Sequence, residues 1–159
     1  WSGFQTSYLV TKTDIFACAN IGAPITDMVT GYLGIRGGSG LPRYFMYEEW
    51  QSRMGKSLWE AKDKYLASSA IVEADKIHTP LLIWHNDKDE AVAYEQGRAL
   101  YLAMRRLQRP AWHLNYKGEG HFLGNQAAQK DWTIRMKQFF DYYLLFQIFL
   151  LVYSFVLLI

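Results

Sequence analysis

The chain has 159 residues, half of them hydrophobic and 16 % aromatic, and a formal net charge of +2. This length suits one domain with a substantial core and is too short for two ordinary domains, and the composition excludes a disordered chain. The weak charge and the scattered basic residues exclude a nucleic-acid surface. The one cysteine, Cys18, excludes an internal disulfide, and its apolar neighbours predict a buried structural thiol.

The first part of the chain predicts a helix, a strand and a loop. Apolar residues at nearly helical spacing predict a helix over 1–13, and a short apolar run predicts a buried strand over 16–21. A glycine-rich loop follows over 31–40. A phosphate cradle would need a Gly-Lys-Ser/Thr end, which this loop lacks, so we predict no nucleotide site.

Two polar helices are predicted next, over 47–54 and 58–69. Both have the charge pattern of exposed helices, and Glu60 and Lys64 form an i,i+4 pair on the second. Their aromatic residues suit a pocket lining, but packing against neighbouring elements is the more ordinary explanation for Tyr47, Trp50, Trp59 and Tyr65.

The rest of the chain alternates regularly between strands and helices. We predict strands over 80–84 and 111–116, an amphipathic helix over 94–107, and a last helix over 130–143. The alternation predicts an α/β fold with a mostly parallel sheet flanked by helices. No internal repeat or low-complexity linker interrupts it.

The end of the chain has a different composition. Residues 142–159 carry no charge, and this run of 18 residues just reaches the length of a membrane span. No basic flank follows that would orient a span, so we favour an aberrant tail over a membrane segment. The chain starts at Trp1 without an initiator Met or a signal-peptide pattern. We therefore divide it into a domain over 1–143 and a hydrophobic tail over 144–159.

Two polar loops carry the candidate chemistry. Asp89 lies in the loop after the strand over 80–84, and His121 lies in the loop after the strand over 111–116, 32 positions later. Reactive side chains in an open α/β sheet collect outside the carboxyl ends of the strands. Acid before histidine is also the order of the second half of an α/β-hydrolase triad, in which a carboxylate orients the histidine that takes the serine proton.

Other residues near these loops are rivals for the same roles. Asp87 and Glu90 compete with Asp89, and His78, His85 and His113 compete with His121. We expect a structural role for His78 and His113, the latter with satisfied hydrogen bonds, and we expect His85 to pair with Asp87 and shape the loop. The histidines lack metal-type spacing such as H-E-x-x-H, so we predict no metal.

The nucleophile of such a triad is missing. The first residues resemble the far side of a nucleophile elbow, G-x-S-x-G, cut just after its serine. The nucleophile would then immediately precede Trp1, and the backbone N–H of Trp1 would be an oxyanion-hole donor. Ser2 is a poor nucleophile candidate because no strand precedes it. We expect Ser2 to be the small residue where the helix meets the sheet.

From Trp1 to about Tyr143 the chain resembles the catalytic domain of the prolyl oligopeptidase family of serine peptidases. The segments that carry the resemblance are Trp1-Ser2-Gly3-Phe4, Thr13-Asp14-Ile15-Phe16, Ala23-Pro24-Ile25-Thr26-Asp27-Met28, Ser69-Ala70 and Ala74-Asp75-Lys76-Ile77. The most specific segments are Thr79-Pro80-Leu81-Leu82-Ile83-Trp84-His85-Asn86-Asp87-Lys88-Asp89 and Gly118-Glu119-Gly120-His121. The family loop pattern H-G-x-x-D-x-x-V places the acid at Asp89, and the family histidine corresponds to His121.

The resemblance implies a partial α/β-hydrolase fold, a peptide substrate, an acyl-enzyme mechanism and no cofactor. It also implies an N-terminal β-propeller, which this chain does not contain, and an exported location by analogy with bacterial relatives. Ser2 and Ala93 depart from the glycine and proline usual in the family, and the hydrophobic tail has no counterpart. Two alternatives stay open: an esterase or lipase-like hydrolase on the same triad, and a non-catalytic member of the fold. We expect the isolated chain to be inactive.

Overall fold

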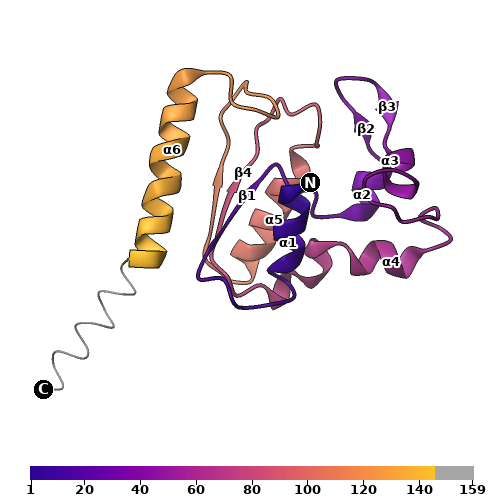
Figure 1. Cartoon of the computed structure of the whole chain (residues 1–159), viewed down its shortest axis with the longest axis horizontal. Helices are drawn as coiled ribbons and strands as arrows, with labels where there is room; N and C mark the ends of the chain where they lie inside the picture. The colour runs from indigo at the N-terminus through magenta and orange to yellow at the C-terminus, as the bar shows by residue number, and fades with distance from the viewer. Residues whose placement is uncertain (146–159) are drawn as a thin grey trace, which may run out of the picture.

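Three parallel strands form the centre of the fold, and helices cover both faces of this sheet (Figure 1). The computed structural model describes residues 1–145. The strands of the central sheet are β1 (Ala19–Gly22), β4 (Leu81–Trp84) and β5 (Ala111–Leu114). The α-helices are α1 (Ser2–Leu9), α2 (Met28–Tyr32), α3 (Tyr44–Glu48), α4 (Lys62–Ala67), α5 (Glu95–Arg106) and α6 (Gln126–Phe140). The remaining elements are the hairpin strands β2 (Ile35–Arg36) and β3 (Leu41–Pro42), the 3-10 helix η1 (Ala70–Lys76) and the π-helical turn η2 (Asp141–Leu145).

The carboxyl ends of the three parallel strands are level. The sheet order is β1-β4-β5, with Gly22 opposite Trp84 and Trp84 opposite Leu114. The loops that follow the strands therefore leave the sheet at the same edge, where parallel α/β folds place their sites. This register brings the Asp89 loop next to the His121 loop.

Helices cover both faces of the central strand β4, which explains why β4 is a continuous apolar run. Leu81 and Ile83 pack on one face with Leu100 and Met104 of α5. The other face meets α6, where Trp84 lies 5.5 Å from Trp132, measured between ring centroids. Burying side chains of this size contributes about 1.5–3 kcal/mol each to the free energy of unfolding.

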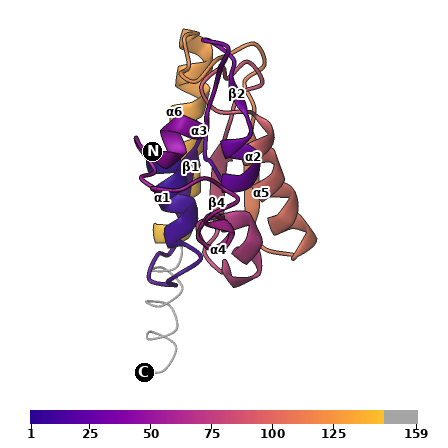
Figure 2. The ribbon, with the colours of Figure 1, turned by 90° about the vertical axis from the view of Figure 1, so that its right-hand side faces the viewer.

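A second group of helices forms a lobe beside the sheet. It contains α2, α3, α4 and the β2–β3 hairpin, and in Figure 2 it lies in front of the sheet, with α6 behind. Its core holds Tyr32, Tyr47 and Tyr65 among methionine and leucine side chains. Gln96 of α5 joins this lobe to the sheet unit, because its side-chain Nε2 donates to the hydroxyl of Thr30 in α2 at 2.8 Å.

The lobe differs from the two polar, exposed helices that the sequence predicts. Tyr47 and Tyr65 are fully buried, although the nearby Trp50 is 65 % exposed. Helix α4 begins only at Lys62, so the predicted Glu60–Lys64 pair on one helix face does not form. Glu60 instead accepts from the backbone N–H of Ser57, at 3.0 Å. The prediction of exposed helices is wrong because the charge pattern describes only the outer side chains. The expected packing of aromatic residues on neighbouring elements is confirmed for Tyr47 and Tyr65.

Some predicted boundaries are also wrong. The first helix ends at Leu9 rather than near residue 13. Just after this end, the hydroxyl of Thr11 donates to the carbonyl of Tyr8 at 2.7 Å, and such a side-chain bond competes with continuation of the helix. Strand β1 starts at Ala19, where its pairing with β4 starts. Phe16, which the predicted strand over 16–21 includes, lies outside β1 and is 39 % exposed.

The predicted loop over 31–40 is largely structured. Gly31 and Tyr32 lie in α2, and residues 35–40 belong to the β2–β3 hairpin, whose Gly40 has a φ of +69°. The last helix starts earlier than predicted, because the Asn125 side chain caps it by accepting from the N–H of Ala127 at 2.8 Å. Cys18 is half-buried rather than buried, and that burial raises the pKa of its thiol.

The predicted hydrophobic tail falls almost wholly outside the described residues, which end at 145. Within residues 1–145, no helix combines the length and apolarity needed to cross a membrane.

Candidate active site

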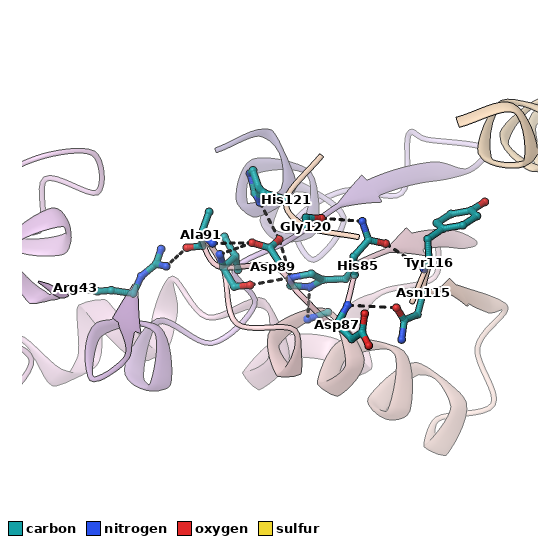
Figure 3. A network of polar contacts seen from close by, with 12 residues as sticks. Arg43, His85, Asp87, Asp89, Ala91, Asn115, Tyr116, Gly120 and His121 are labelled. Atoms are coloured by element: carbon teal, nitrogen blue, oxygen red, sulfur yellow. Dashed lines mark hydrogen bonds and ion pairs between the residues drawn. The ribbon is translucent and has the colours of Figure 1, made fainter. Parts of the chain in front are cut away.

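The Asp89 and His121 side chains meet at the carboxyl edge of the sheet (Figure 3). The Nδ1 atom of His121 lies 2.8 Å from Oδ2 of Asp89. An ionised carboxylate only accepts hydrogen bonds, so Nδ1 carries the proton and donates it to Asp89. The His121 side chain is 35 % exposed, whereas that of Asp89 is fully buried. Among residues 1–145 no hydrogen bond occupies Nε2 of His121, which leaves this atom free to accept a proton from an incoming group.

The carboxylate of Asp89 is held by four donors. Its Oδ1 accepts from the backbone N–H groups of Ala91 and Val92, at 2.8 Å each. Its Oδ2 accepts from His121 and lies 3.3 Å from Nε2 of His85. Burial alone would raise the pKa of Asp89, but the hydrogen bonds from His121, His85 and Val92 outweigh it and hold this pKa below its usual range. Asp89 is therefore ionised at neutral pH although it is buried.

His85 is the partner of Asp89 that the sequence did not reveal. Its ring is fully buried, and the backbone N–H of Gly97 donates to its Nδ1 at 3.2 Å. Nδ1 is therefore unprotonated and Nε2 carries the proton, which it shares between Asp89 and the carbonyl of Val92, the latter at 3.1 Å. The expected pairing of His85 with Asp87 is wrong, because the strand end points His85 into the interior. A histidine four positions before the acid is the one sequence signal that could have suggested this contact.

The other rival acids lie outside this contact. Asp87 is exposed and its Oδ1 accepts from the backbone N–H of Gly118 at 2.8 Å, which links the acid loop to the histidine loop. Glu90 is exposed and lies against the hairpin, where its carbonyl accepts from Gly38. Neither carboxylate has a hydrogen bond or an ion pair with His121 within the described residues.

The other rival histidines lie away from the site. His78 is exposed, with Nδ1 3.2 Å from Asp14. His113 stacks between Tyr94 and Tyr101, with ring centroids 5.5 and 5.6 Å away. Within residues 1–145 its buried Nε2 has no partner, so the expectation of satisfied hydrogen bonds is wrong. Burial, together with the neighbouring His85 and Arg98, lowers the pKa of His113 to about 4, and the ring stays neutral at pH 7.

Asn86 holds the two loops together. It is 1 % exposed, and its Nδ2 donates to the carbonyl of Gly120 at 2.8 Å, directly before His121. Its Oδ1 accepts from the backbone N–H of Tyr116 at 3.1 Å. Because a buried amide side chain must satisfy its polar atoms, Asn86 fixes the position of the histidine loop relative to the acid loop.

The start of α1 approaches the same edge of the sheet. Trp1 is the N-cap residue of α1. A Cβ at Gly3 would lie 2.2 Å from the carbonyl oxygen of Gly22, so only glycine permits this approach of α1 to β1. Ser2 is exposed, so the small residue where helix meets sheet is Gly3 rather than Ser2.

A cavity of about 290 Å³ joins Trp1 to His121. Its walls come from the start of α1, from the lobe and from the two site loops. The lining residues include Trp1, Phe4, Ile25, Arg36, Arg43, Met46, Val92, His121 and Phe122. The exposed Phe122 ring lies 5.0 Å from that of His121 between centroids, at the mouth of the cavity. The part of the chain described by the structure contains no group of three His, Cys, Asp or Glu residues able to hold a metal ion.

The parallel sheet, the level strand ends and the helices on both faces define part of an α/β-hydrolase fold. The profile of the prolyl oligopeptidase family, a family of serine peptidases, matches residues 2–146. The chain belongs to this family.

Individual relatives agree with this assignment. An uncharacterized peptidase of Bacillus subtilis, YuxL, is 23 % identical over 132 residues, which are 82 % of this chain and 19 % of the relative. A probable dipeptidyl-peptidase 5 of Aspergillus clavatus is 30 % identical over 91 residues, 56 % of this chain and 12 % of the relative. The chain therefore spans about a fifth or less of the length of these relatives.

Solved structures agree on the fold. The uncomplexed acylaminoacyl peptidase of Pyrococcus horikoshii superimposes with a TM-score of 0.72 at 20 % identity, covering 89 % of this chain and 22 % of that one. A putative dipeptidyl aminopeptidase IV of Bacteroides ovatus gives a TM-score of 0.71 at 20 % identity, covering 89 % of this chain and 18 % of that one.

Proposed function

We propose that this chain is the C-terminal part of a serine peptidase domain, and that it supplies the base and the acid of a catalytic triad. His121 is the general base and Asp89 is the carboxylate that orients it. The observation that carries the proposal is the cavity shared by Trp1 and His121, together with the 2.8 Å contact between His121 and the buried Asp89. A nucleophilic serine immediately before Trp1 would reach this cavity from the helix side.

The proposed reaction follows from the protonation states. The serine Oγ attacks the carbonyl carbon of the peptide bond, and its proton moves to Nε2 of His121. Asp89 stabilises the resulting imidazolium through the Nδ1–H bond. The backbone N–H of Trp1 donates to the oxyanion of the tetrahedral intermediate. His121 then gives its proton to the leaving amine as the C–N bond breaks, and a water molecule, activated by His121, hydrolyses the acyl-enzyme.

The first test is the residue that precedes Trp1 in the parent protein. A Gly-x-Ser sequence there completes the nucleophile elbow. Any other residue at the last position would leave Asp89 and His121 without a nucleophile and would favour a non-catalytic member of the fold. Turnover of esters without peptides by the parent would instead select an esterase. We also propose that the isolated chain is inactive, and measurable turnover by purified 1–159 would refute this.

The second test assigns the roles by substitution in the parent protein. We expect His121→Gln and Asp89→Asn each to lower kcat by about 10⁴-fold, with KM changed little, because both act after substrate binding. His78→Gln is the matched control, since His78 is an exposed histidine bonded to another aspartate, Asp14. Equal activity of His121→Gln and His78→Gln would contradict the assignment.

We propose residues 1–143 as the peptidase portion and 144–159 as a separate hydrophobic segment. The family match, which ends at residue 146, supports this division. A carbonate wash of membranes from expressing cells tests whether the segment anchors the protein: retention in the pellet indicates an anchor, and release excludes one.

A further inference from the structure

Arg43 carries a buried charge for which residues 1–145 supply no counter-ion. The residue is 6 % exposed. Its Nη1 donates to the carbonyl of Ala91, as Figure 3 shows. Its buried Nε has no hydrogen-bond partner, and no ion pair within residues 1–145 involves Arg43. A buried guanidinium in a protein is ordinarily paired with a carboxylate, because an unpaired charge is strongly disfavoured away from water.

The neighbour of Arg43 does not replace a carboxylate. The hydroxyl of Tyr47 is also buried without a hydrogen-bond partner among the described residues. Burial raises the pKa of Tyr47 to about 12, although the charge of Arg43 and a hydrogen-bonding contact from its guanidinium act in the opposite direction, so the phenol stays neutral. Arg43 and Tyr47 thus form a buried pair of polar groups, in which Nε of Arg43 and the hydroxyl of Tyr47 could each make a further hydrogen bond to a ligand.

The cavity next to Arg43 has a positive lining. Arg43 and Arg36 both line the cavity that joins Trp1 to His121, and none of its lining residues is an aspartate or a glutamate. Arg36 is exposed on β2, so it lies where the cavity opens to solvent. A cavity with a low-dielectric wall and two cations concentrates anions and strengthens their binding.

We propose that this cavity binds a carboxylate of the substrate, with Arg43 as the residue that recognises it. The inference rests on the proposed peptidase function, because it places the carboxylate near the bond that His121 acts on. Two sources share this chemistry: an acidic side chain of the peptide and its C-terminal α-carboxylate. A guanidinium suits both because its planar fork donates two parallel hydrogen bonds to one carboxylate.

Three small ligands distinguish these sources on the purified chain. N-acetyl-glutamic acid α-amide carries only the side-chain carboxylate, N-acetyl-glutamine carries only the α-carboxylate, and N-acetyl-glutamine α-amide carries neither. Their dissociation constants are measured by NMR titration of the wild-type chain. We expect one carboxylate ligand to bind at least about tenfold more tightly than the neutral amide, the gain of one charge-assisted bond. Equal binding of all three ligands, or no binding of either acid, would overturn the proposal.

Two variants assign the preference to Arg43. Arg43→Gln is expected to reduce the ratio of the affinities for the acid ligand and the neutral ligand to about one, while Arg43→Lys keeps part of this preference. Arg105→Gln is the control, because Arg105 is an exposed arginine in the last turn of α5 and should leave the ratio unchanged. A preference that survives Arg43→Gln would belong to another cation of the cavity and would refute the role of Arg43.

This test does not depend on catalysis. The ligands contain no bond that must be cleaved, so a parent protein without a serine before Trp1 leaves the binding result standing. Conversely, an active parent peptidase with no carboxylate preference would refute this inference alone.

Discussion

Replacing Gly97 by alanine should destabilise the protein, although helix propensity alone predicts that alanine would stabilise it. Gly97 lies in α5, where alanine is favoured over glycine by about 1 kcal/mol. However, a Cβ at this position would lie 2.6 Å from Nδ1 and 3.0 Å from Cβ of His85. The His85 ring has no room to move, since it is fully buried and bonded at both nitrogens. Overpacking of this kind costs about 2–3 kcal/mol, so the expected net loss of unfolding free energy is about 1–2 kcal/mol.

Urea denaturation of the purified chain at pH 7 measures this loss, and two further variants separate its causes. Ala99→Gly, at an exposed position of the same helix, should cost about 1 kcal/mol through helix propensity alone. In a His85→Ala background the clash is absent, so Gly97→Ala should become stabilising, and a double-mutant cycle isolates the difference. A Gly97→Ala variant more stable than the wild type would refute the packing of α5 against His85.

Three other predictions concern the charge state and the packing of the site. The pKa of Asp89 lies below that of an unfolded aspartate, so the ionised Asp89 stabilises the fold above about pH 4, and this stabilisation is lost as the pH falls further. In urea titrations at successive pH values, Asp89→Asn should therefore reduce the loss of unfolding free energy at acid pH. The pKa of His113 is about 4 in the folded protein, against about 6.5 in the unfolded chain, so the free energy of unfolding should fall as the pH drops from about 6.5 to about 4. His113→Phe should remove this part of the pH dependence in thermal unfolding. Gly3→Ala should lower the free energy of unfolding by about 3 kcal/mol, because its Cβ would meet the backbone of Gly22. The control Ser2→Ala should change the urea midpoint little, and equal midpoints for the two variants would contradict the close packing of α1 on β1.

The central sheet was largely predictable because its strands are local signals. Apolar runs that end in polar loops identify β4 and β5, and the loop residues Asp89 and His121 follow from their positions after these strands. The α/β-hydrolase fold and the family, both anticipated from the residues, are confirmed by the family match over residues 2–146 and by the solved structures. The catalytic roles of Asp89 and His121 stay predictions.

The lobe was predicted least well, because its fold depends on contacts between distant segments. The pattern of charges over 47–54 and 58–69 indicated exposed helices, yet Tyr47 and Tyr65 pack together beneath that polar surface. Short helices of five or six residues carry little periodicity of their own. Their positions are decided by the aromatic core that they enclose.

The residues available for chemistry can be read directly from the chain: an acid and a histidine, each after a buried strand, in the order of a hydrolase triad. How these groups are held depends on contacts between distant segments. The hydrogen bond from Arg43 to Ala91 joins residues 48 positions apart. The hydrogen bond from Gly97 to His85 fixes the His85 ring, whose other nitrogen contacts the carboxylate of Asp89. Burial and pairing of polar groups are properties of the assembled fold, because each depends on which distant segments exclude water from the same place.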